Sequence, residues 1–141
     1  MQFFHLLNRS KDFKVLIILV VLDSIFGVLR AIRQKKFNSN IGIDGLIRKF
    51  GMLISVIFFM LVDLIEEINF IGFIPEEIRS FIGISKVGIS TMFIFLYIVY
   101  EGLSILKNMI KCKLPIPKKL QVWLEKVFNK YTKELEEEKE K

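Results

Sequence analysis

The chain has very few of the residues that build disulfides, metal sites and nucleophilic active sites. One cysteine, Cys112, and one histidine, His5, occur among 141 residues. They are too few for an internal disulfide or a Cys/His metal site, and no nucleophile stands in a pattern with an acid or base partner. We therefore expect no catalytic, metal-binding or cofactor-binding residues and no enzymatic activity.

Arginine is also scarce, although the chain is basic with a net charge of +6. Lysine outnumbers arginine sixteen to five, whereas recognition of bases and phosphates favours the forked guanidinium group. The charges stand at the flanks of long apolar blocks, as they do in membrane proteins. This distribution predicts membrane topology and argues against a nucleic-acid partner.

Three apolar blocks dominate the chain, and none contains proline. A bilayer core about 30 Å thick needs roughly 20 helical residues to cross it, and bulky apolar residues cover every face of these blocks. We predict an all-α integral membrane protein with three spans at about 15–32, 50–66 and 84–108. Residues 1–14 form an N-terminal amphipathic segment in this prediction, 15–112 the membrane domain, and 113–141 a cytoplasmic amphipathic helix with a charged tail.

The charges between the blocks predict the orientation of the chain. Six basic residues lie between positions 30 and 49, where Gly42 and Gly45 suit a turn, and four glutamates face one arginine between positions 66 and 80. The positive-inside rule places the basic loop and the C-terminus on the cytoplasmic side of the membrane. The N-terminus then lies outside if residues 15–32 span, and inside if Asp23 makes this block a re-entrant hairpin.

The segment after Pro117 has the apolar spacing of an amphipathic helix. Its other face is rich in lysine, so we expect it to lie on the anionic inner leaflet or to associate with copies of itself. The residues of this membrane-surface or self-association helix are Leu120, Trp123, Leu124, Val127, Phe128 and Tyr131.

Polar or small residues recur at helical spacing inside each apolar block. The stripes are Asp23, Gly27 and Ala31; Gly51, Ser55, Phe59 and Asp63; and Ser90, Ile94, Tyr97, Glu101, Ser104 and Asn108. One interpretation is that they join the helices of a single monomer. The other, which we favour because three helices are few to enclose so many polar groups, is that they line a pore or an oligomer interface. Asp63, with Glu66 and Glu67, is expected at a solvated helix end.

Two stretches resemble the family of toxin-secretion and phage-lysis holins, which includes phi29-type phage holins and clostridial toxin-export holins. The stretches are "LDSIFGVLRAIRQKKFNSNIGIDGLIRK" and "YEGLSILKNMIKCKLPIPKKL", and with Asp63 the resemblance extends over about residues 16–128. The chain departs from the family's common residues at Tyr100, Lys107 and Cys112.

The resemblance implies a small protein of the bacterial inner membrane that forms homo-oligomers and opens a non-specific pore. Through this pore a cargo such as an endolysin or a large toxin would pass without specific binding. Composition and spacing alone indicate only a basic membrane protein with polar helix faces that is prone to oligomerise. The alternative function is a non-pore accessory or scaffold subunit of an export complex.

Overall fold

The computed structural model describes residues 11–35, 39–66, 68–84 and 86–127, and these residues are helical or irregular, without a strand. The helices are α2 (Lys11–Arg33), α3 (Ser39–Ile65), α4 (Glu76–Phe81) and α5 (Ile89–Lys111). Residues 118–127 form a further helical segment. The predicted all-α class, with three long apolar helices and a C-terminal helix, is confirmed.

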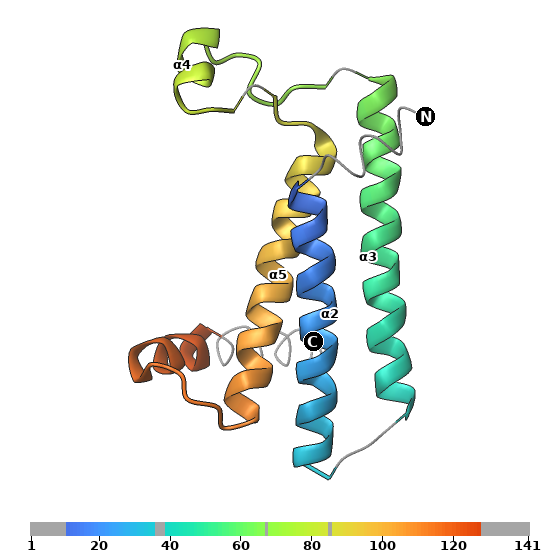
Figure 1. Ribbon diagram of the computed structural model, residues 1–141, viewed down its shortest axis with the longest axis vertical. Helices are drawn as coiled ribbons and strands as arrows, with labels where there is room; N and C mark the ends of the chain where they lie inside the picture. The colour runs from blue at the N-terminus through green and yellow to red at the C-terminus, as the bar shows by residue number, and fades with distance from the viewer. Residues whose placement is uncertain (1–10, 36–38, 67, 85, 128–141) are drawn as a thin grey trace, which may run out of the picture.

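The three long helices stand side by side as one bundle (Figure 1). α2 and α5 run parallel and contact each other along much of their length, whereas α3 runs antiparallel to both and packs mainly against α5. α4 and its loops lie at one end of the bundle. The last turn of α2, the first turn of α3 and residues 118–127 lie at the other, which we call the loop end.

Each long helix is long and apolar enough to cross a membrane. At 1.5 Å per residue, the 23 residues of α2 extend about 35 Å, slightly more than a bilayer core. Bulky side chains cover the outer surface of the bundle, and Phe50 and Phe95 are 69% and 68% exposed. A bundle with this surface is a multi-pass membrane protein whose outer face contacts lipid.

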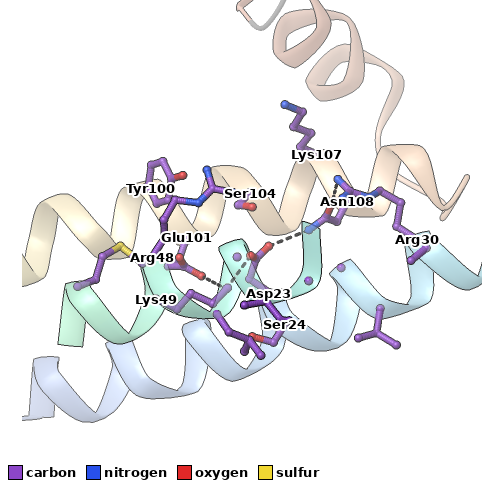
Figure 2. A pocket seen from close by; sticks show the side chains of 18 of the residues that line it. Asp23, Ser24, Arg30, Arg48, Lys49, Tyr100, Glu101, Ser104, Lys107 and Asn108 are labelled. Carbon is purple, nitrogen blue, oxygen red and sulfur yellow. Dashed lines mark hydrogen bonds and ion pairs between the residues drawn. The ribbon is translucent and has the colours of Figure 1, made fainter. Parts of the chain in front are cut away.

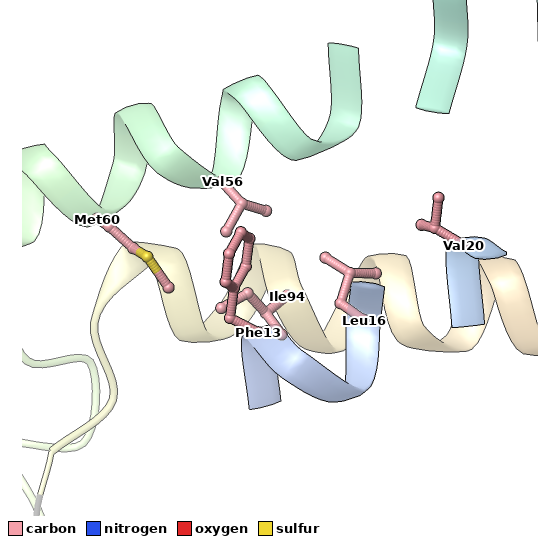
Figure 3. Packing of buried hydrophobic residues seen from close by; sticks show 6 residues of the cluster. All are labelled: Phe13, Leu16, Val20, Val56, Met60 and Ile94. Carbon is pink, nitrogen blue, oxygen red and sulfur yellow. The ribbon is translucent and has the colours of Figure 1, made fainter. Parts of the chain in front are cut away.

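The apolar core lies in the half of the bundle near α4, and Figure 3 shows its members. In this half Phe13 and Leu16 of α2 meet Val56 and Met60 of α3 and Ile94 of α5. Beside this cluster the rings of Phe59 and Phe93 stack with their centroids 4.1 Å apart.

The sequence interpretation left open whether residues 15–32 span or form a re-entrant hairpin, and α2 is one uninterrupted helix. Two details of the interpretation are wrong. Gly42 and Gly45 lie within α3 and not in a turn, because a helix tolerates glycine at about 1 kcal/mol each when the flanking sequence continues it. α5 begins at Ile89 and not near position 84, because the residue before it, Gly88, is extended.

Candidate functional site

A cluster of charged side chains joins the three long helices in the half of the bundle near the loop end (Figure 2). The ammonium group of Lys49 on α3 lies 2.7 Å from Oδ2 of Asp23 on α2 and 2.8 Å from Oε2 of Glu101 on α5. It also donates to the backbone oxygen of Val20 at 3.2 Å. One cation of α3 therefore bridges two carboxylates on the two other helices.

The cluster continues toward the loop end through Asn108 of α5. The side-chain amide of Asn108 donates to Oδ1 of Asp23 at 2.9 Å, and its oxygen accepts a hydrogen bond of 2.9 Å from Arg30 of α2. Further along, Arg33 donates to the backbone oxygen of Cys112, just after α5. α2 and α5 are thus held in register by successive polar contacts.

Burial makes these contacts obligatory. Glu101 is 1% exposed, Asn108 4% and Asp23 7%. A charge removed from water is tolerated when it is paired and its remaining lone pairs are satisfied, and its partner's removal leaves it uncompensated. Among the described residues no deeply buried side-chain nitrogen or oxygen lacks a hydrogen-bond partner. The cluster is complete within one copy of the chain.

A second polar contact fixes the opposite end of α5. One oxygen of the Asp63 carboxylate accepts the N–H of Ile89, and the other accepts both the N–H and the hydroxyl of Ser90. The two N–H groups are backbone donors that the first turn of a helix leaves unsatisfied. A Cβ at Gly88 would overlap this carboxylate, so the close approach requires glycine. Asp63 therefore caps α5 across the connection and is not the solvated helix end that we expected.

Midway along the bundle, Ser55 and Tyr97 form a neutral polar contact. Their hydroxyl oxygens are 3.0 Å apart, and the Ser55 hydroxyl also lies 2.8 Å from the backbone oxygen of Met52. This contact links α3 to α5 between the ion cluster and the apolar core.

The structure brings most of the residues of the predicted polar stripes together between the helices of one copy. Asp23, Ser55, Asp63, Ser90, Tyr97, Glu101 and Asn108 all make polar contacts between helices. Gly27, Ala31 and Ser104 line an open cleft beside the ion cluster, and Gly51 is exposed. Their predicted part in a pore or an oligomer interface stays a prediction.

The predicted surface helix is described in part. Leu124 is fully buried and Trp123 is 54% exposed, whereas Leu120 and Val127 are half-buried. Phe128 and Tyr131 lie outside the described residues. The association of this helix with a membrane or with its own copies stays a prediction.

Lys49 and Arg30 are the members of the cluster that the sequence interpretation left out. Lys49 was assigned to a loop because Gly42 and Gly45 suggested a turn before it. A signal was present: Asp23 and Lys49 lie at equal sequence distances from position 36, the centre of the connection between α2 and α3. In an antiparallel helical hairpin, two such residues lie at the same depth.

The described residues contain no group of three or more His, Cys, Asp and Glu side chains arranged to hold a metal ion. The fold and the cluster define a small multi-pass membrane protein whose long helices share a buried, mutually paired set of charges. The chain belongs to the bacteriophage holin family, whose model matches residues 3–129. The resemblance inferred from the two sequence stretches is thereby confirmed.

Two curated relatives come from clostridia. The chain is 39% identical to the Holin-like protein TcdE of Clostridioides difficile over 128 residues, which cover 91% of this chain and 77% of that protein. It is 28% identical to an uncharacterized 14.9 kDa protein of Clostridium perfringens over 115 residues, 82% of this chain and 75% of the relative. No solved structure matches the chain.

Proposed function

We propose that the chain acts as a pore-forming holin in the inner membrane of a bacterium. Copies of it accumulate, oligomerise and open a lesion through which a lytic enzyme or a large toxin leaves the cytoplasm. It acts without catalysing a reaction. Family membership supports this proposal, and so does the likeness to a protein named as holin-like.

The observation that carries the proposal is the ion cluster itself. The polar face of α5 from Ser90 to Asn108 is turned inward in the single copy, and the ammonium of Lys49 ties this face to α3. α3 makes little contact with α2 and leaves an open cleft beside it. If α3 moves away, Asp23 and Glu101 lose the ammonium of Lys49 and need a new polar partner or water. In an oligomer the same faces would line an aqueous path, so the single copy has the features of a closed state.

The orientation in this proposal follows the positive-inside rule. The loop end carries more basic residues (Arg30, Arg33, Lys35, Lys111, Lys113, Lys118 and Lys119) than the end with α4 (Lys11, Lys14, Arg79 and Lys86). The loop end and the C-terminus therefore lie in the cytoplasm and the N-terminus lies outside.

Expression of the protein alone in a bacterium tests the proposal. We expect an abrupt loss of membrane potential, measured with a potential-sensitive dye, followed by release of a cytoplasmic reporter protein. Glu101→Gln, which removes one charge from the cluster, should shift the time of this loss. Glu125→Gln makes the same chemical change at an exposed position outside the cluster and should leave the timing as in the wild type.

If the protein reaches the membrane but the potential and the reporter are retained, pore formation is refuted. The accessory or scaffold function would then be the better account. Equal timing for Glu101→Gln, Glu125→Gln and the wild type would refute the part assigned to the cluster and leave pore formation standing.

A further inference from the structure

An open cleft of about 670 Å³ lies beside the ion cluster, between α2, α3 and α5 (Figure 2). Four cationic side chains and two carboxylates are among the residues that line it. The cations are Arg30, Arg48, Lys49 and Lys107, and the carboxylates are those of Asp23 and Glu101. The cleft is therefore basic overall.

The cleft offers hydrogen-bond donors that the protein leaves available. Both carboxylates accept from Lys49. In contrast, the guanidinium of Arg48 makes one long hydrogen bond of 3.4 Å, from Nε to the backbone oxygen of Asp44. Within the described part of the chain, the other four N–H donors of Arg48 and the hydroxyl of Ser104 have no hydrogen-bond partner. A ligand rich in acceptor oxygens and carrying negative charge fits this set of donors.

Glycines are among the residues that line the cleft. A Cβ built at Gly27 or at Gly45 meets no atom within 4 Å, so the space beside these two residues is open. Gly27 belongs to α2 and Gly45 to α3, and the two helices are little in contact here. The cleft is therefore open between these two helices.

The position of the cleft selects the source of the ligand. Arg30 lies in the last turn of α2, and Arg48 lies in the first half of α3, so the cleft is at the loop end of a bundle that spans a membrane. Basic pockets between membrane helices on the cytoplasmic side bind anionic lipid headgroups. A second copy that placed its own loop end in the cleft would set basic residues against basic residues, and like charges repel. We propose that the cleft binds the phosphate of an anionic phospholipid through the guanidinium of Arg48. This proposal requires membrane insertion but does not depend on pore formation.

Native mass spectrometry of the full chain in detergent tests the site. The wild type is titrated with phosphatidylglycerol or with phosphatidylcholine. We expect selective retention of phosphatidylglycerol, and about tenfold weaker binding in Arg48→Gln, because charge-assisted hydrogen bonds are lost. Lys119→Gln removes the same charge from an exposed position outside the cleft and should change the affinity by less than about twofold. Gly45→Leu should weaken binding without any change of charge, because it fills the cleft.

Three results would overturn the proposal. Equal retention of the two lipids would mean that the cleft does not select anionic headgroups. Equal effects of Arg48→Gln and Lys119→Gln would show general attraction to a basic surface. Displacement of the lipid by millimolar glycerol phosphate would identify a site for a soluble phosphate compound.

Discussion

The two halves of the bundle are held together by different forces, although the same three helices run through both. Near α4, Phe13, Leu16, Val56, Met60 and Ile94 interlock as an apolar core. Near the loop end, Lys49 joins two carboxylates, and an open cleft lies beside them. Apolar packing holds the helices together in the half near α4, whereas ion pairs hold them together in the half near the loop end.

The difference matters because the surrounding lipid is as apolar as the core. Burial of apolar surface gives little drive for helices to associate within a bilayer, so the apolar half relies on close packing. A buried charge without its partner is unfavourable in lipid as well as in protein, so the charged half specifies which faces meet. We infer that the charged half sets the register of the helices and is the half in which a few changes can release α3.

The largest expected effect comes from Lys49→Met, which leaves the Asp23 and Glu101 carboxylates buried without their cation. Breaking a buried ion pair in this way costs about 3–5 kcal/mol. The measurement is the free energy of unfolding in detergent micelles, followed by circular dichroism. The triple variant Lys49→Met/Asp23→Asn/Glu101→Gln should recover most of the loss, because no uncompensated charge remains. A single variant as stable as the wild type would show that the cluster does not hold the bundle together.

Ile94→Ala probes the apolar half in the same assay. Ile94 is 3% exposed within the core, and the cavity left by its truncation should lower the free energy of unfolding by about 2 kcal/mol, at the low end for such changes. Phe95→Ala, at the neighbouring exposed position, is the control and should cost less than about 0.5 kcal/mol. If Ile94→Ala cost more than Lys49→Met, the comparison of the two halves would be reversed.

Asp63→Ala removes the cap of α5 and should cost about 1 kcal/mol. The effect should be local, so hydrogen exchange at the amides of Ile89 and Ser90 is the sensitive measurement, with faster exchange expected. Asp63→Asn keeps one acceptor oxygen, so its exchange rates should fall between those of the wild type and those of Asp63→Ala. Uniform acceleration of exchange along all three helices would mean instead that Asp63 supports the whole bundle.

How much the sequence could predict differs between the two halves. Long apolar blocks without proline predicted the three helices, because helix formation in a membrane depends on composition over many residues. Residues such as Glu101 and Asn108 were singled out because their spacing places them on one helix face, and both belong to the ion cluster. Their partners were harder to find, since pairing depends on where α3 begins.

The misassigned residues show why the position at which α3 begins mattered. Gly42 and Gly45 were interpreted as a turn, and this moved Lys49 out of the helix and out of the site. Asp63 was assigned to a solvated end because its partners, the first amides of α5, lie 26 and 27 residues further along the chain. Residue spacing within one helix identifies its polar face. Predicting the contacts between helices also requires the register of one helix against the next.

The smallest expected effect is that of Tyr97→Phe, which tests the boundary between the two halves. The change removes the hydroxyl contact with Ser55 but keeps the ring, and hydrogen bonds between membrane helices average about 0.6 kcal/mol. Tyr100→Phe, at an exposed position on the same helix, is the matched control and should have almost no effect on the free energy of unfolding. A double-mutant cycle with Ser55→Ala isolates the contact. A coupling energy above about 2 kcal/mol, beyond the range known for such bonds, would show that strong polar contacts continue past the middle of the bundle toward the apolar core. A coupling energy near zero would show that the strong polar contacts end at Glu101.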